Sequence, residues 1–114
     1  VLGTGPDTER VVEEIRRRSA GNLRLAGVLS ARREEVGQEV AGCEILGHVS
    51  ELRGPVADLK VDSIVIALDE KDRALLSAEV LFRCKDAGIA VLDTRDFHQI
   101  AARTARPAKA MEPA

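Results

Sequence analysis

The sequence predicts a single α/β domain built on a doubly wound, parallel sheet. Three observations lead to this fold class. Short apolar runs alternate with segments of helical spacing along the 114 residues. Two glycines, Gly3 and Gly5, separate the first apolar residues from the first helical segment. The composition is 45% hydrophobic but only 2% aromatic, so the core of the domain must be aliphatic. A chain of this size buries roughly two-thirds of its unfolded surface without needing disulfides or metals.

The first half of the chain is predicted to form one helix, a strand, and two weaker elements. Pro6 suits the first position of a helix over residues 6–19, which Gly21 then ends. Residues 23–29 alternate weakly and predict a strand. The remaining expectations are a loop over 30–43, a short strand over 44–46, and a weak helix over 49–60 that Gly54-Pro55 interrupts.

The second half has stronger patterns. The continuous β-branched run at 63–68 is typical of a strand buried on both faces, and residues 89–93 resemble it. A helix is predicted over 73–87, where apolar residues recur at helical spacing and Gly88 follows as a C-cap. A short helix is expected over 95–103, beginning near Thr94, and residues 104–114 are expected to be a flexible tail or linker.

This alternation of strands and helices predicts a Rossmann-like, three-layer domain over residues 1–103. Ligands of such sheets bind beyond the carboxyl ends of the strands, where the strand order reverses. We therefore expect a crevice lined by residues 3–8, 29–33 and 67–70, with Ala67, Leu68 and Asp69 on its far wall.

The glycine turn is the first candidate binding element. Gly3, Gly5 and Thr8 follow a G-x-G-x-x-G pattern in which threonine replaces the third glycine. Such a turn lets a pyrophosphate approach the backbone and the free N–H groups of a helix start. Thr4, Pro6 and Asp7 complete the candidate turn, although Asp7 and Glu9 would compete with a bound anion.

The second candidate element follows the second predicted strand. Enzymes that use NAD place an acidic residue there to hold the ribose hydroxyls. This chain has Ser30-Ala31-Arg32-Arg33, and the two arginines favour a phosphorylated ribose, as in NADP or coenzyme A. A scaffold with a degenerate pocket is an equal alternative. Hydride transfer with NAD is disfavoured because no tyrosine is present to handle a substrate hydroxyl.

Several function classes are disfavoured by composition. A net charge of −2 and two phenylalanines as the only aromatic residues give no basis for nucleic-acid binding. Cys43 and Cys84 lack the spacing of a zinc site and are expected to be free thiols in a reducing cytosol. No apolar run approaches the roughly 18 residues of a membrane span, and no signal peptide is visible. The start at Val1, two residues before a glycine, predicts a piece of a longer protein.

Two stretches resemble one family. They are LGTGPDTERVVEEIRRR and VDSIVIALDEKDRALLSAEVLFRCKDAGIAVLDTRDFHQIAARTA. Over roughly residues 1–105 the chain resembles the Rossmann-like, coenzyme A-binding-like domain of bacterial polyprenyl-phosphate sugar-1-phosphate transferases, which act in exopolysaccharide biosynthesis. The amino-terminal domain of membrane-bound nucleotide-sugar dehydratases looks similar.

The resemblance implies an accessory or regulatory domain at the cytoplasmic face of the bacterial plasma membrane. In such transferases membrane helices precede this domain and a separate catalytic domain follows it, so no catalytic residue is carried onto this chain. The implied ligand is a nucleotide or nucleotide-sugar, among them NAD(P), coenzyme A and UDP-sugars. The implied partners are the remaining domains of the parent protein and further copies of the chain. The alternatives are the amino-terminal domain of a nucleotide-sugar dehydratase, epimerase or NAD(P)-linked oxidoreductase, and an assembly module without a ligand.

Overall fold

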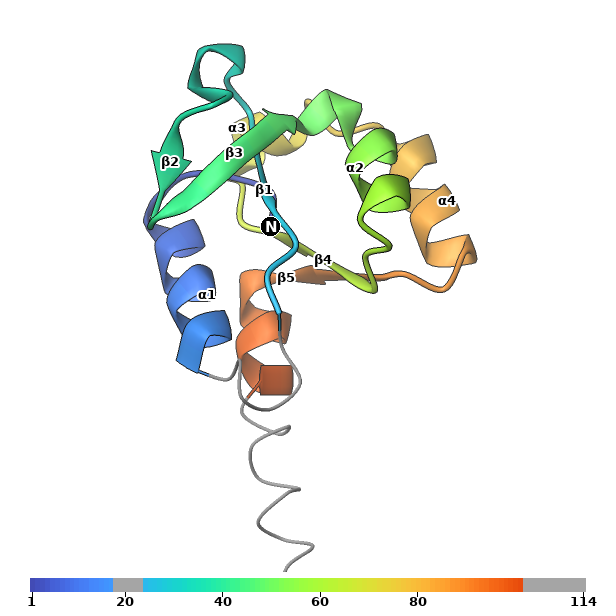
Figure 1. The fold of residues 1–114 in the computed structure, drawn as a ribbon. Helices are drawn as coiled ribbons and strands as arrows, with labels where there is room; N and C mark the ends of the chain where they lie inside the picture. The colour runs from blue at the N-terminus through green and yellow to red at the C-terminus, as the bar shows by residue number, and fades with distance from the viewer. Residues whose placement is uncertain (18–23, 102–114) are drawn as a thin grey trace, which may run out of the picture.

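The structure is a computed structural model that describes residues 1–17 and 24–101. It is a mixed α/β arrangement in which a small, mostly parallel sheet lies between helices (Figure 1). The elements in chain order are α1 (Pro6–Arg17), β1 (Val28–Ser30), η1 (Arg33–Glu35), β2 (Glu39–Val40), β3 (Cys43–His48), η2 (Val49–Glu51), α2 (Arg53–Asp58), β4 (Ser63–Ile66), α3 (Glu70–Arg73), α4 (Ala78–Asp86) and β5 (Ala90–Asp93). Residues 94–101 are helical.

Residues 1–3 form the centre of the sheet. β1 pairs in parallel with β3, and β4 pairs in parallel with β5. Leu2 bridges the two pairs, because it lies parallel to Leu29 of β1 and to Ile66 of β4. The Leu2 N–H donates to the Val65 carbonyl at 2.8 Å, and the Leu2 carbonyl accepts from the Ala67 N–H at 2.8 Å. The observed order is therefore β2, β3, β1, residues 1–3, β4 and β5.

Apolar clusters lie on both faces of the sheet. β4 directs Ile64 and Ile66 into one cluster and Val65 into another, as the alternation of a strand requires. The first cluster contains Leu52, just before α2, and Cys84 of α4. The second contains Val11 and Ile15 of α1 together with Phe97 and Ala101 of the last helical stretch. α1 begins at Pro6 as predicted, and its buried residues form one apolar stripe. Cys84 is buried as well.

Several element predictions need correction. Residues 73–87 are not one helix, because α3 ends at Arg73 and α4 begins after Ser77, whose hydroxyl accepts from the Val80 N–H at 3.3 Å. The loop expected over 30–43 contains η1 and β2, and β2 runs antiparallel to β3, so the sheet is not wholly parallel. The weak helix over 49–60 is divided into η2 and α2, with Pro55 near the start of α2.

Other predictions hold within the described residues. β4 and β5 fall inside the predicted strands, and Gly88 follows Ala87, the C-cap of α4, with a φ of +90°. The strand predicted over residues 23–29 corresponds to β1, which starts later than expected, at Val28, and ends at Ser30. The predicted helix end at residues 18–19 and the tail at 104–114 lie outside the described residues. Within residues 1–17 and 24–101, none of the helices has both the length and the apolarity to span a membrane.

Candidate functional site

A crevice opens at the carboxyl ends of residues 1–3, β1 and β4. Its volume is about 340 Å³, and its lining comes from three loops that are distant in the sequence. The lining residues are Gly3, Thr4, Gly5, Pro6, Asp7, Ala31, Arg32, Glu35, Ala67, Leu68, Asp69 and Asp72. Nine of the twelve predicted site residues are among them. Thr8, Ser30 and Arg33 are not.

The glycine turn forms one wall of the crevice. Gly3 has a φ of +120°, and a Cβ atom there would lie 2.6 Å from the Ala67 carbonyl oxygen, so only glycine fits. Gly5 is open, with no atom within 4 Å of the position a Cβ would take. The Gly5 carbonyl accepts from the Thr8 N–H at 3.0 Å and starts α1.

Two residues of the turn limit its use for an anion. Pro6 has no N–H group, so it removes one of the donors that a helix start usually offers. Thr8 is fully buried beneath the turn, and its side-chain oxygen has no hydrogen-bond partner among the described residues. Thr8 therefore packs between helix and sheet, as the third position of the pattern requires, and does not reach the crevice.

Glu35 joins two walls of the crevice. Its carboxylate accepts from the Thr4 hydroxyl at 2.8 Å and from the Ser30 hydroxyl at 2.5 Å. Ser30 is fully buried, and its oxygen also accepts from the Arg32 N–H at 2.9 Å, which fixes the loop after β1. The hydrogen bonds from Ser30 and Thr4, with a smaller contribution from the Arg32 charge, lower the pKa of Glu35. Glu35 is therefore held as a carboxylate in the lining of the crevice.

The two predicted arginines diverge. Arg32 lines the crevice. The guanidinium of Arg33 lies 3.8 Å from the Glu51 carboxylate and 3.4 Å from the Ser50 hydroxyl, away from the crevice. The buried His48 ring holds the same loop, because its Nε2 lies 3.0 Å from the Ala31 carbonyl and its Nδ1 lies 2.7 Å from the Ser50 hydroxyl. The two arginines therefore do not form a joint phosphate site.

The far wall of the crevice is acidic. Asp69 caps α3 by accepting from the Asp72 N–H at 2.8 Å. Together with Asp7 and Glu35, these residues bring four carboxylates to the lining, against the single guanidinium of Arg32. Such a lining repels a pyrophosphate and offers acceptors to hydroxyl groups. No group of three or more metal-ligating side chains is present in residues 1–17 and 24–101.

Sequence reasoning missed Glu35 and Asp72, whereas Ala31 falls within the predicted lining 29–33. Asp72 follows Asp69 at the spacing of a helix cap. Glu35 was missed because an acidic residue was sought directly after the strand, whereas η1 returns the chain to the sheet edge over the next five residues. An acidic residue within one short helical turn of the strand end would have been the useful signal.

The chain was compared with protein-family models, with curated proteins and with solved structures, and none of the three comparisons found a match.

Proposed function

We propose that this chain is a non-catalytic, Rossmann-like accessory domain of a polyprenyl-phosphate sugar phosphotransferase in exopolysaccharide biosynthesis. The resemblance of residues 2–18 and 61–105 to that family supports the assignment. The strand order also supports it, because residues 1–3 lie between β1 and β4 and the chain runs outward from this centre in both directions. In this proposal the domain lies on the cytoplasmic side of the membrane and regulates the catalytic domain.

The ligand proposed for the crevice is a nucleotide or nucleotide-sugar that is held by its ribose hydroxyls. The observation that carries this proposal is the Glu35 carboxylate, which accepts two hydroxyl hydrogen bonds at the strand switch point. A ribose diol supplies two hydroxyl donors of the same kind. It can therefore replace the Thr4 and Ser30 hydroxyls on Glu35 without leaving the carboxylate unpaired.

The geometry changes the expected ligand preference. The sequence favoured a phosphorylated ribose because of Arg32 and Arg33, but Arg33 pairs with Glu51 instead. A phosphate on the ribose would meet Glu35 and the acidic far wall. We therefore expect adenosine, which has no phosphate, to bind most tightly. NAD and UDP-sugars, which carry a pyrophosphate, should follow it, and NADP and coenzyme A, which carry a further phosphate, should bind least tightly.

Isothermal titration calorimetry of the chain tests this proposal with adenosine, NAD, NADP, coenzyme A and a UDP-sugar. Weak binding of an unphosphorylated ribose is expected, and Glu35→Gln should weaken it about tenfold by removing a charged acceptor. Arg33→Ala is the matched control and should leave the affinity unchanged, since Arg33 lies outside the crevice. Tighter binding of NADP than NAD would reject the ribose assignment. NAD turnover would favour the oxidoreductase alternative.

A second candidate is an assembly module that binds no nucleotide. The acidic lining and the missing N–H group of Pro6 favour it, because both oppose a pyrophosphate. Gly5→Val separates the two candidates, since a side chain at Gly5 enters open space and should fill the crevice without disturbing the fold. In the parent transferase, unchanged sugar-phosphate transfer with this variant favours the assembly module. Loss of nucleotide-dependent regulation favours the ligand site.

A further inference from the structure

β5 lies at one edge of the sheet and is paired on one side only. Within residues 1–17 and 24–101, its single partner is β4, which runs parallel to it. The Asp62 carbonyl accepts from the Ala90 N–H at 3.1 Å, so Ala90 faces β4. Alternate residues of a parallel strand direct both of their backbone polar groups to the same neighbour. The N–H and the carbonyl of Val91 therefore face away from β4, towards the free side of β5.

The sequence of this segment is that of an inner strand. Residues 89–92 are consecutively apolar, as is typical of a strand that is covered on both faces. Natural sheets often protect a free edge with a lysine, a proline or a bulge, which blocks further pairing. None of these occurs in residues 89–92, and the register between β4 and β5 is regular. The segment is therefore suited to pairing with another strand on its free side.

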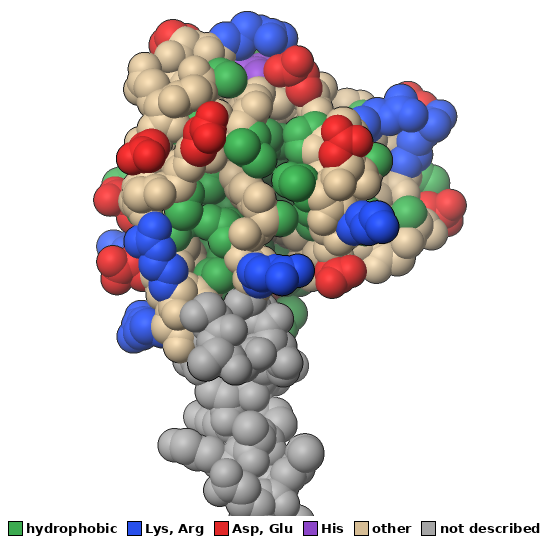
Figure 2. All heavy atoms as spheres, viewed as in Figure 1, with side chains coloured by type: hydrophobic (Ala, Val, Ile, Leu, Met, Phe, Trp, Pro, Cys, Tyr) green, Lys and Arg blue, Asp and Glu red, His purple; other side chains and the backbone are tan. Residues whose placement is uncertain are grey.

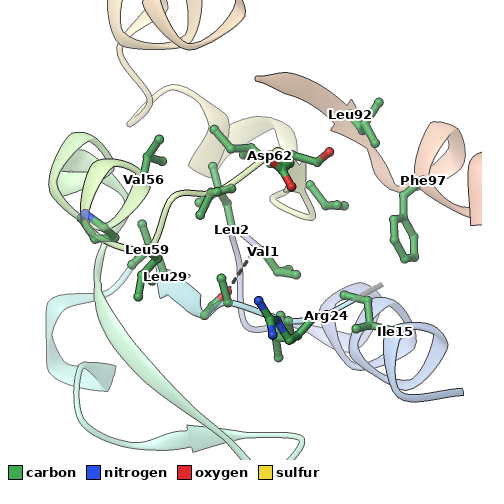
Figure 3. Close-up of a pocket in the computed structure, with 18 of the residues that line it drawn as sticks. Val1, Leu2, Ile15, Arg24, Leu29, Val56, Leu59, Asp62, Leu92 and Phe97 are labelled. Atoms are coloured by element: carbon green, nitrogen blue, oxygen red, sulfur yellow. Dashed lines mark hydrogen bonds between the residues drawn. The ribbon is translucent and has the colours of Figure 1, made fainter. Parts of the chain in front are cut away.

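The side chains of β5 are also less buried than those of β4. The three apolar residues of β4 are at most 9% exposed, whereas Val91 and Leu92 are half-buried and Ala90 is exposed. Val91 packs against the apolar cluster on the α4 side. Figure 3 shows Leu92 and Phe97, which border one hollow on the opposite face. A further strand beside β5 would complete the burial on both faces.

α4 carries an exposed aromatic residue next to this edge. Figure 1 shows α2 and α4 side by side with α4 on the outer side, and both pack against the same apolar cluster. Phe82 of α4 is 68% exposed, the largest value among the large hydrophobic residues that the structure describes.

The side of α4 on which Phe82 lies follows from the helical repeat. Leu81, Lys85 and Phe82 lie about 60°, 100° and 160° round the helix axis from the buried Cys84, all in the same sense. A right-handed connection from β4 through α4 to β5 directs this sense towards the free side of β5. Phe82 and Lys85 therefore lie above the free edge.

The charges around Phe82 suit a second copy of the same helix. Glu79 and Lys85 lie three residues before and three residues after Phe82. When two copies of α4 cross antiparallel at Phe82, Glu79 of each copy lies opposite Lys85 of the other, whereas a parallel crossing brings like charges together. Glu79 already bonds to Arg83 of its own helix at 2.9 Å, so the carboxylate is held at the surface. Figure 2 shows charged groups of both signs around small apolar areas on the side where α4 lies.

We propose that the free edge of β5 and the adjoining side of α4 bind a second copy of this chain. The two β5 strands would run antiparallel about a two-fold axis at Val91, and the Val91 N–H of each copy would donate to the Val91 carbonyl of the other. The two Phe82 side chains would meet beside the same axis, where both lose contact with water. One continuous sheet would then extend through both copies.

Analytical ultracentrifugation and hydrogen exchange test this proposal. Sedimentation of the chain at increasing concentration is expected to show a monomer–dimer equilibrium. As the dimer forms, the Val91 amide should exchange about tenfold or more slowly, while the Ala90 amide, which bonds to Asp62 in both states, is the internal control. A monomer at every concentration would overturn the proposal. So would equal protection of the Val91 amide in the monomer, because another segment of the same chain would then pair with it.

A matched pair of substitutions locates the contact. Phe82→Glu places a charge at its centre and should raise the dissociation constant of the dimer about tenfold or more, without touching the core. Val36→Glu adds the same charge at a residue that is 42% exposed and lies beside β2, at the other edge of the sheet. It should leave the dissociation constant unchanged. A dimer that is unaffected by Phe82→Glu would contradict the proposed contact.

A charge exchange tests the antiparallel arrangement. Glu79→Lys should weaken the dimer, because lysines at 79 and 85 would then face each other across the axis. Glu79→Lys combined with Lys85→Glu should restore it. Circular dichroism at far-ultraviolet wavelengths shows whether α4 stays folded in both variants. A folded double variant that dimerises as weakly as Glu79→Lys would reject the antiparallel crossing.

Discussion

At the scale of single residues, the two glycines of the opening turn have different tasks. Gly3 lies against the Ala67 backbone with a φ of +120°, so the close contact between the central strand and β4 depends on its missing side chain. Gly5 lines the crevice, and a Cβ atom there would have no other atom within 4 Å. The sequence pattern alone presents both as parts of one phosphate turn, whereas the structure assigns packing to Gly3 and access to Gly5.

Replacement by alanine should have a large effect on stability at Gly3 and almost none at Gly5. Gly3→Ala should destabilise the fold by about 2 kcal/mol or more, because it combines a disfavoured φ with a contact to the Ala67 carbonyl. Gly5→Ala should change the free energy of unfolding by less than about 0.5 kcal/mol. Urea unfolding of both variants provides the measurement. Equal losses would mean that the turn does not lie against Ala67 as described.

Glu35 predicts an acid-dependent loss of stability. Its pKa in the folded chain lies below the ordinary value of 4.5, so the unfolded chain binds the proton first as the pH falls. The contribution of Glu35 is complete above that ordinary value and is lost as the pH falls through the lowered one. Glu35→Gln should therefore flatten the decline in unfolding free energy over this acidic range, as measured by urea unfolding at successive pH values.

A second variant checks the cause. Thr4→Val removes one of the two hydroxyl donors to Glu35 and should reduce the effect of Glu35→Gln on the acidic slope. An unchanged effect would show that the Thr4 hydroxyl does not act on Glu35.

At the scale of elements, apolar periodicity predicted the parts of the fold that depend on burial. It identified α1, β4 and β5, whose apolar residues enter the clusters on the two faces of the sheet. It failed between residues 73 and 87, where it predicted one helix. Ser77 interrupts that helix because its hydroxyl caps the start of α4. It also missed β2, whose two residues are too few for any period to appear.

The candidate site could be predicted only in part for a similar reason. Strand ends fix which loops meet at one edge, so most of the crevice followed from the predicted strand order. The directions of Arg33 and Glu35 depend on η1, a single short turn. Local hydrogen bonds to Ser30 and Ser50 decide those directions, and no spacing in the sequence records them.

The cap of α4 gives a prediction at this scale. Ser77→Ala removes the acceptor for the Val80 N–H and should destabilise the chain by about 1 kcal/mol. Ser77→Asp restores an acceptor and adds a negative charge at the start of the helix, so it should recover most of the loss. Thermal unfolding followed by circular dichroism measures both. No loss with alanine would indicate that α3 and α4 can join into the single helix that periodicity suggests.

At the scale of the whole molecule, one residue joins the two halves of the sheet. β1, β2 and β3 form one set of hydrogen-bonded strands, β4 and β5 form another, and Leu2 pairs with both. Leu2 is 1% exposed and also belongs to the larger apolar cluster. The stability of the entire domain therefore depends on the strand pairing and packing of residues 1–3.

The amino group of Val1 predicts a second pH dependence for the chain with a free amino-terminus. Burial lowers its folded pKa from 8.0 to about 6, so the unfolded chain binds more protons between these values and stability rises with pH across them. The rise should reach up to about 3 kcal/mol, because one pKa unit corresponds to about 1.4 kcal/mol. Acetylation of Val1 should abolish the slope between the two pKa values in urea unfolding. A slope that persists after acetylation would have to come from another group.

The central position of Leu2 has a consequence for how the chain is made. Residues 1–3 form hydrogen bonds near residues 29 and 66, so they obtain their second neighbour only after more than half of the described chain has followed them. A nascent chain that stops before β4 leaves one side of Leu2 unpaired, as an open edge that attracts other strands. Translation pauses before residue 63 should thus be the moment at which this domain is most prone to aggregate.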